Sequence, residues 1–434
     1  MNAWFEKQFK LSEHGTNVRT EILAGITTFM TMAYIIFVNP GILSATGMPF
    51  GALLVATCLG ASLATFLMAF LANYPFALAP GMGLNAFFAF TVVLGMKIPW
   101  QVALAAIFIE GIIFILLTCT KVREEVENSI PKTLKIGVSA GIGIFITFIG
   151  LQSAGLIVAN QAVLVGISPL RGNVGGLLAL AGLLLMVTLE TRKVTGGILL
   201  GIIAVTIAGI PLGITKMPEG IVSMPPSLSP IFMKMDFSMI ASPSFWVVVF
   251  TFFFVDFFDT VGTLVGVSNR AGMLDENGRL PKASQALMAD AVGTTAGAVL
   301  GTSTVTTFVE SASGVEQGGR TGLTALTVAV LFLLATLFSP LIAVVPACAT
   351  APALIMVGGY MMMGFKDMDF SDWTEFFPAI IAFFMMPFAY SIAAGIEFGI
   401  VSYVALKLLM GRGKEVNWML YVQAVLFILN KALL

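Results

Sequence analysis

The chain has 434 residues, of which 58% are hydrophobic and only 10% are charged, and its formal net charge is −1. Because about a quarter of the residues in a soluble domain are charged, this composition excludes an ordinary soluble protein and indicates an integral membrane protein. The nearly neutral charge balance also argues against a nucleic-acid partner.

The first half of the chain begins with a charged segment that ends at Thr20. The apolar run that follows is too long for the hydrophobic core of a signal peptide and ends in Asn39-Pro40, so we expect it to be retained. Seven apolar segments are predicted in this half, at 21–39, 52–71, 79–94, 99–119, 135–156, 174–190 and 197–213.

The second half follows a polar, proline-rich linker at 214–243. Seven more apolar segments are predicted, at 244–267, 285–300, 302–317, 322–345, 349–364, 375–391 and 393–410. A final apolar stretch at 416–434 includes Asn417, Gln423, Asn430 and Lys431, and we expect it to lie along the cytoplasmic interface rather than to cross the membrane. Seven spans in each half require the halves to be inverted relative to each other. The predicted fold is therefore all-α, with repeats at 1–213 and 244–412 and a C-terminal helix at 413–434.

The distribution of Lys and Arg supports this topology. With the N-terminus in the cytoplasm and every segment crossing, 17 of the 22 Lys and Arg fall on the cytoplasmic side and 4 fall outside, with Lys431 unassigned. We therefore expect a multi-pass protein of the cell (inner or plasma) membrane with both termini in the cytoplasm.

The third segment of each half is interrupted. Segment 79–94 is short and opens with Ala-Pro-Gly-Met-Gly, and segment 302–317 is short and rich in Ser, Thr and Gly. Short, Gly- or Pro-interrupted segments at corresponding places in two halves predict broken helices that meet at a binding site in the middle of the membrane. Weak support for the repeat comes from Ala56-xxx-Gly60 and Ala289-xxx-Gly293, while Gly137-xxx-Gly141 predicts close helix packing.

Asp256 and Asp259 lie within an otherwise apolar segment. Each such carboxylate costs about 2.5 to 3.5 kcal/mol in the middle of a membrane helix, and a spacing of three residues places both on one helix face. A polar ligand, an ion or a proton is the expected reason, and a purely structural pair is the alternative. Two neighbouring carboxylates in a low dielectric are not expected both to be ionised, so one would bind substrate while the other holds or passes a proton.

Other polar residues lie in or near the interrupted segments. Glu310 is the only carboxylate at the second break, with a helix-capping role as the alternative. Asn85 offers a donor and an acceptor at the first break, with an inter-helix hydrogen bond as the alternative. Asp290 precedes the second break and is expected to tie the site together, whereas Glu110 and Glu397 are expected to be structural. Phe87, Phe88 and Phe308 flank these positions and would stack on a planar ligand, although aromatic residues in membrane proteins more often pack.

The polar groups also restrict the ligand. No Lys or Arg lies at the centre of any predicted span, which argues against an anionic substrate. Acidic acceptors, an amide and hydroxyls between aromatic rings suit a neutral planar heterocycle with N–H donors, such as a nucleobase. The chain has no Walker pattern, one histidine and three scattered cysteines, so we expect no ATP site, no zinc or disulfide and no cofactor.

Four stretches of the chain resemble a known family. They are Thr28–Pro40 with its Asn39-Pro40, Ala79–Phe90, Phe254–Thr260 and Gly301–Val315, and they are similar to the azaguanine-type (AzgA-like) purine permeases of the nucleobase–cation symporter-2 group, within the nucleobase–ascorbate transporter superfamily. The resemblance implies fourteen spans in two inverted repeats of seven, with a short strand in the broken spans 3 and 10. It also implies a core domain at about 20–120 and 244–345 and a gate domain at about 135–213 and 349–410.

The resemblance further implies proton-driven import of a purine, with guanine and hypoxanthine expected and adenine as the alternative. The substrate-binding residues would be Asp256, Glu310, Asn85, Phe87, Phe308 and Thr307, and the proton-coupling residues would be Asp259, Asp256 and Asp290. Uracil and xanthine are disfavoured because relatives that take them carry Glu and a nearby His in span 8. Many relatives form homodimers through the gate domain.

Two other functions are alternatives to purine transport. A channel or anion carrier on the same fold is the nearest alternative. A membrane-embedded enzyme, such as an aspartyl protease or a prenyl transferase, is disfavoured. Asp256 and Asp259 share one helix, whereas a protease dyad needs carboxylates from two facing helices, and the chain lacks acid pairs of the Asp-Asp-xx-Asp type that hold magnesium diphosphate.

Overall fold

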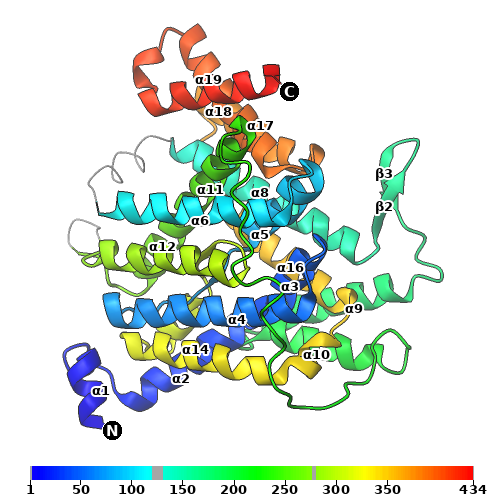
Figure 1. Cartoon of the computed structure of the whole chain (residues 1–434), viewed down its shortest axis with the longest axis vertical. Helices are drawn as coiled ribbons and strands as arrows, with labels where there is room; N and C mark the ends of the chain where they lie inside the picture. The colour runs from blue at the N-terminus through cyan, green and yellow to red at the C-terminus, as the bar shows by residue number, and fades with distance from the viewer. Residues whose placement is uncertain (1, 120–130, 276–279, 434) are drawn as a thin grey trace.

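The computed structural model describes residues 2–119, 131–275 and 280–433, and these ranges are mostly helical with few, short strands (Figure 1). Within them, eight helices are long and apolar enough to cross a membrane, and four shorter apolar helices accompany them. The predicted all-α membrane fold is therefore confirmed, and the count of fourteen spans stays a prediction. Lys121, Arg123 and Arg279, which the topology counted as cytoplasmic, lie outside the described residues.

Elements from both halves of the chain build a first bundle. Its members from the first half are α1 (Asn2–Phe9), α2 (Val18–Met32), α3 (Ile35–Ser44), α4 (Phe50–Leu67) with the π-helical turn η1 (Met68–Ala72), β1 (Leu78–Pro80), α5 (Met82–Ala86) with the π-helix η2 (Phe87–Gly95), and α6 (Trp100–Thr118). Its members from the second half are α11 (Pro243–Arg270), α12 (Ala283–Leu300), β4 (Val305–Thr307), α13 (Ser311–Glu316), α14 (Gly322–Ala335) and α15 (Ser339–Ala343).

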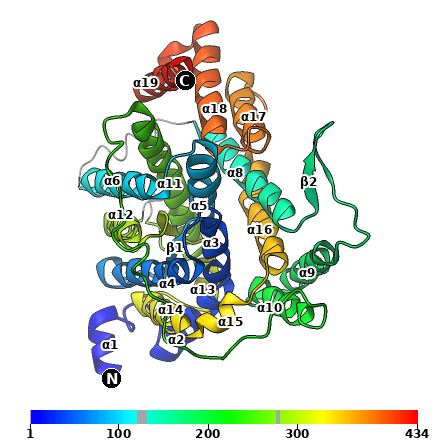
Figure 2. The same ribbon diagram turned by 45° about the vertical axis from the view of Figure 1, so that its right-hand side comes forward.

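The remaining helices pack mostly with one another in a second bundle. They are α8 (Lys132–Ser153), α9 (Val174–Thr191), α10 (Gly197–Gly209), α16 (Ala347–Met362), α17 (Trp373–Phe388) and α18 (Ile392–Leu409). The hairpin of β2 (Ile157–Asn160) and β3 (Leu164–Ile167) projects from the body in both views (Figures 1 and 2). Helix α19 (Trp418–Leu433) contacts α18 and α11 near the C-terminus, and its expected place along the membrane interface stays a prediction.

Small residues allow the helices of the two halves to approach closely. In the first bundle, α6, α12, α4 and α14 lie side by side in that order (Figure 1). A Cβ placed on Gly293 of α12 would lie 2.5 Å from the Cβ of Ala64 on α4. A Cβ placed on Gly137 of α8 would lie 2.5 Å from the carbonyl oxygen of Ala379 on α17. The close packing predicted for Gly137-xxx-Gly141 is therefore confirmed.

The two interrupted segments pair through β1 and β4. The strands are antiparallel, with Leu78 opposite Thr307, Ala79 opposite Thr306 and Pro80 opposite Val305. Backbone hydrogen bonds extend the pairing at both ends, from Gly81 to the Thr304 carbonyl oxygen at 3.0 Å and from Phe308 to the Ala77 carbonyl oxygen at 2.9 Å. β1 lies beside α3 and α4 (Figure 2). The short strands expected in both broken segments are present.

Threonine side chains close the outer edges of this strand pair. The Thr65 hydroxyl of α4 donates to the Leu78 carbonyl oxygen at 3.0 Å and accepts from the Leu78 N–H at 2.9 Å. The Thr294 hydroxyl of α12 does the same for Val305, at 2.9 and 3.2 Å. Strand edges inside a membrane protein must find partners for their backbone groups. The two hydroxyls therefore allow a two-stranded sheet to exist in an otherwise helical interior.

Candidate functional site

Two carboxylates lie near each other where the two interrupted segments meet. Glu310 lies between β4 and α13, and Asp259 lies on α11, close enough for the two groups to interact electrostatically. A Cβ placed on Gly81 would lie 3.5 Å from Asp259 Oδ2, so this carboxylate borders the first break as well. Both residues are only partly buried, and the neighbouring Val309 is 47% exposed. We call Asp259 and Glu310 the acid pair.

Tyr34 fixes one side of the acid pair. It lies at the junction where α2 ends and α3 begins, and its ring is buried. Its hydroxyl donates a hydrogen bond of 2.6 Å to Glu310 Oε1. Hydrogen bonds to a carboxylate are short and strong, so this bond orients Glu310 and occupies one of its two oxygens. The alternative capping role for Glu310 is not seen, because its side chain makes no hydrogen bond to the start of α13.

Asn85 is fully buried in α5 and joins the two breaks. Its Oδ1 accepts a hydrogen bond from the Ser303 hydroxyl, and its Nδ2 donates to the Pro80 carbonyl oxygen at 3.4 Å. This geometry matches the inter-segment hydrogen bond that was the alternative for this residue. Asn39 makes a similar link, because its Nδ2 donates to the hydroxyls of Thr57 at 2.7 Å and Thr302 at 2.9 Å.

Asp256 lies in the interior of the first bundle. It is fully buried together with Asp290 of α12 and Glu110 of α6. Thr260 Oγ1 lies 3.4 Å from Asp256 Oδ1 and 3.1 Å from Asp290 Oδ2. The carboxyl group of Glu110 is within hydrogen-bonding reach of Asp256. We call Glu110, Asp256 and Asp290 the interior acid cluster.

The two aspartates of α11 therefore have different surroundings. Three helical residues leave the side chains about 60° apart around the axis, and α11 packs against α6 as well as against β4 and α13. The hypothesis joined Asp256 with Glu310 and gave Asp259 to proton coupling. In the structure, the aspartate beside Glu310 is Asp259, and the aspartate in the interior is Asp256.

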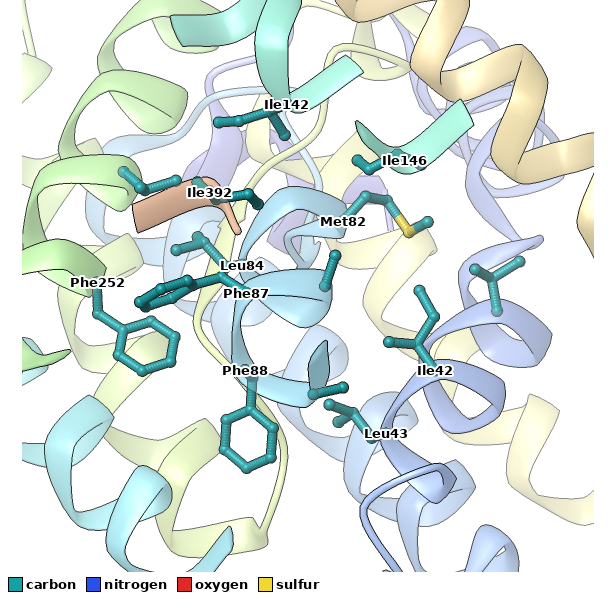
Figure 3. Packing of buried hydrophobic residues seen from close by; sticks show 14 of the residues in the cluster. Ile42, Leu43, Met82, Leu84, Phe87, Phe88, Ile142, Ile146, Phe252 and Ile392 are labelled. Carbon is teal, nitrogen blue, oxygen red and sulfur yellow. The ribbon is translucent and has the colours of Figure 1, made fainter. Parts of the chain in front are cut away.

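The aromatic residues predicted to stack on the ligand also lie in two different places. Phe87 packs edge to face against Phe252 of α11, with ring centroids 4.7 Å apart, and Figure 3 shows the two rings turned toward each other. Phe88 lies 6.5 Å from the same ring. Phe308 stays near the acid pair, with its ring centroid 6.5 Å from that of Tyr34. Thr307 is buried in β4 opposite Leu78.

Sequence reasoning missed three groups at this site. Tyr34 and Asn39 lie in a stretch that carried the family resemblance but were given no role of their own. Thr260 directly follows Asp259 and lies one helical turn after Asp256. This spacing could have indicated that the Thr260 hydroxyl contacts Asp256. Glu110 was expected to be structural, because a single acid in an apolar segment does not reveal what it faces.

The segments that form the site contain no cationic side chain. Lys, Arg and His are absent from residues 20–96, 98–120, 235–269 and 283–319. Within the described residues, no group of three or more His, Cys, Asp or Glu is placed to hold a metal ion. The site therefore offers hydrogen-bond acceptors and hydroxyls, which suit a ligand that brings its own N–H or O–H donors.

Comparisons with known proteins agree with this chemistry. A family model described as the Permease family (Xan_ur_permease) matches residues 19–398. The adenine permease AdeP of Escherichia coli is 45% identical over 98% of this chain and 95% of its own length. The guanine/hypoxanthine permease PbuG of Bacillus subtilis is 45% identical over 97% of this chain and 98% of its own. Among solved structures, the transmembrane domain of the cyanobacterial bicarbonate transporter BicA matches with a TM-score of 0.66 over 87% of this chain and 97% of that domain, at 17% identity, which shows a shared fold only.

Proposed function

The chain belongs to the Permease family of the nucleobase–ascorbate transporter superfamily, and from this premise we propose that it imports purine nucleobases across the cell membrane by proton symport. The family consists of transporters rather than enzymes. One relative named above is a permease for adenine and the other for guanine and hypoxanthine, at the same identity of 45%. Overall sequence similarity therefore does not distinguish adenine from guanine and hypoxanthine as the substrate, and the distinction has to come from the residues of the site.

The observation that best supports this function is the acid pair. A carboxylate accepts hydrogen bonds and donates none when ionised. Tyr34 already occupies Glu310 Oε1, which leaves Oε2 and the carboxylate of Asp259 for a ligand. The Watson–Crick edge of guanine presents an N–H and an amino group side by side, and hypoxanthine presents the N–H alone. Adenine lacks that ring N–H, so the acid pair favours guanine and hypoxanthine over adenine.

The geometry supports a revised division of roles. Glu310 and Asp259 contact the base, with Phe308 and Thr307 beside them. Asn85 holds the two breaks together, and Phe87 supports α11 by packing on Phe252. Asp256 and Asp290 lie in the interior of the first bundle and belong to proton coupling. The absence of cations from the segments around the site speaks against an anion carrier on this fold.

The arrangement in the membrane completes the proposal. The first bundle acts as the core domain and the second as the gate domain, with fourteen spans, both termini in the cytoplasm and a homodimer formed through the gate domain. Protonation and substrate must favour the same conformational state, because a ligand shifts an equilibrium only through its differential affinity. Alternating access then follows from movement of one bundle against the other.

Uptake by cells that lack their own purine permeases tests this function. Labelled hypoxanthine should accumulate, and guanine should compete better than adenine, with xanthine and uracil weakest. A protonophore should abolish accumulation, while empty-vector cells provide the background. Uptake that survives the protonophore, or competition by bicarbonate and sulfate but not by purines, would show that the function is a different one.

A further inference from the structure

Glu110 has no role in the proposed function, yet its surroundings are unusual for a structural residue. Its side chain is 0% exposed. Neither of its carboxyl oxygens meets an N–H or O–H donor in the part of the chain that the structure describes. The group that it faces within hydrogen-bonding reach is another carboxyl, that of Asp256, and Asp256 Oδ2 lacks a donor there too.

Two facing carboxyls can form a hydrogen bond only if one of them carries a proton. The alternative is two buried anions without a counter-ion, which is strongly unfavourable in a low dielectric. Of the elements packed against α6 and α11, η2, α5, β4, α12 and α13 contain no Lys, Arg or His, and the cations on these elements are Arg270 in the last position of α11 and Lys431 near the end of α19. Besides Glu110 and these cations, the titratable groups on these elements are Asp256, Asp259, Asp290, Glu316 of α13 and Tyr421 of α19.

We propose that Glu110 and Asp256 share a proton that is loaded and released during transport, so that Glu110 is half of a proton site behind the substrate site. This inference rests on the proposed function and adds to it a residue on α6. The packing of α6 against both α11 and α12 brings Glu110 to the interior acid cluster. A proton held there lowers the charge of the pair from −2 to −1 without occupying the carboxylates that contact the base.

A hydroxyl chain connects the interior acid cluster to the strand pair. Thr260 Oγ1 lies 3.1 Å from Asp290 Oδ2 and 2.7 Å from Thr306 Oγ1. One hydroxyl carries a single proton, so Thr260 donates to an ionised Asp290 only while it accepts from Thr306. Thr260 Oγ1 also lies 3.4 Å from Asp256 Oδ1, so a proton that moves from the Glu110–Asp256 pair onto Asp290 reverses both bonds. The Thr306 methyl group lies 2.7 Å from where a Cβ on Gly81 would be, next to Asp259. The hydroxyl chain therefore links the protonation of the cluster to one residue of β4, beside the first break.

The test is Glu110→Gln in the purified, full-length protein reconstituted in vesicles. Glutamine keeps the shape and can donate a hydrogen bond to Asp256, but it cannot release a proton. If one proton is taken up with the substrate, the apparent Kd of hypoxanthine in the wild type should rise with pH, by up to about tenfold per pH unit. In Glu110→Gln this slope should flatten, and accumulation driven by a proton gradient should be lost. Exchange of external for internal hypoxanthine, which needs no net proton movement, should continue.

Two further variants separate this result from misfolding. Glu110→Asp retains an ionisable group and should keep a pH-dependent Kd and part of the driven accumulation, which also provides the test if the glutamine variant does not fold. Glu397→Gln removes another buried carboxyl, on α18, and should leave the pH slope unchanged. A Glu110→Gln protein with the wild-type slope and wild-type accumulation overturns the inference and leaves the proposed function intact. A wild-type protein that transports no purine overturns the proposed function instead.

Discussion

Replacing Asp259 and Asp256 of α11 by asparagine, one at a time, should distinguish substrate binding from proton coupling. Asp259→Asn removes a carboxylate acceptor beside Gly81 and Glu310. A hydrogen bond to a charged group contributes about 1.5 to 3 kcal/mol, and since Asp259 is partly solvated we take about 1.5 to 2 kcal/mol, a ten- to thirtyfold rise in the Kd of guanine. Asp256→Asn alters a group that lies in the interior, so the Kd should rise by less than about threefold while proton-driven accumulation is lost.

Equilibrium binding of labelled guanine to the purified proteins, followed by uptake into vesicles, measures both quantities. Each variant differs from the wild type by one oxygen-to-nitrogen exchange and keeps the side-chain volume, so the two variants control for each other. The reasoning from geometry is refuted if Asp256→Asn weakens guanine binding more than Asp259→Asn does. That outcome would restore Asp256 as the residue that contacts the base.

Three other predictions follow from individual contacts. Tyr34→Phe removes the 2.6 Å hydrogen bond to Glu310 and should weaken guanine binding by about 1 kcal/mol, or about fivefold, in the same binding assay; an unchanged Kd would mean that Glu310 needs no orientation. Thr65→Val leaves the N–H and carbonyl of Leu78 without their hydroxyl partner, at a cost of about 1 to 3 kcal/mol for each orphaned group, so the melting temperature in detergent should fall. Thr188→Val is its control, because that exposed hydroxyl bonds only to its own helix, and equal melting temperatures for the two variants would contradict the role of Thr65. Outside the spans, hydrogen bonds from Thr374 and Arg412 lower the pKa of Asp372 to about 2. A lowered folded-state pKa stabilises the fold fully above about pH 4 and loses this effect as the pH falls toward 2. Pepsin should therefore cleave the segment between α18 and α19 slowly at about pH 4 and rapidly near pH 2, whereas Asp372→Asn should be cleaved rapidly at both; slow cleavage of the wild type at both pH values would contradict the ion-pair assignment.

Much of the architecture was predictable because it depends on chain-local signals. Apolar run lengths predicted the membrane spans, and the Gly- and Pro-rich opening of segment 79–94 and the Ser/Thr-rich segment 302–317 indicated where helices break. The strands in those breaks were expected only through the family resemblance. A run of three residues such as Val305–Thr307 has no period long enough to distinguish a strand from a loop.

The roles of the acids could not be predicted from sequence because they depend on what lies around α11. Asp256 and Asp259 are the same residue type in the same apolar stretch, and only the positions of α6, α12 and the strand pair distinguish them. Glu110 is uninformative by itself, since its facing partner is on another helix. Phe87 was a reasonable stacking candidate until Phe252, far away in the sequence, was seen to cover it.

The pairing of β1 with β4 has a consequence for how the protein is made. Ala77 and Ser311, which are hydrogen-bonded beside the strands, are 234 residues apart, so the ribosome completes the first strand long before the second exists. During that interval the peptide groups of β1 that β4 will bond have no permanent partner, and the membrane offers no water to replace it. The nascent first half must therefore keep this stretch in contact with the insertion machinery or with water until the second half arrives. Two halves expressed as separate chains would recover activity only if they assemble together at the time of insertion.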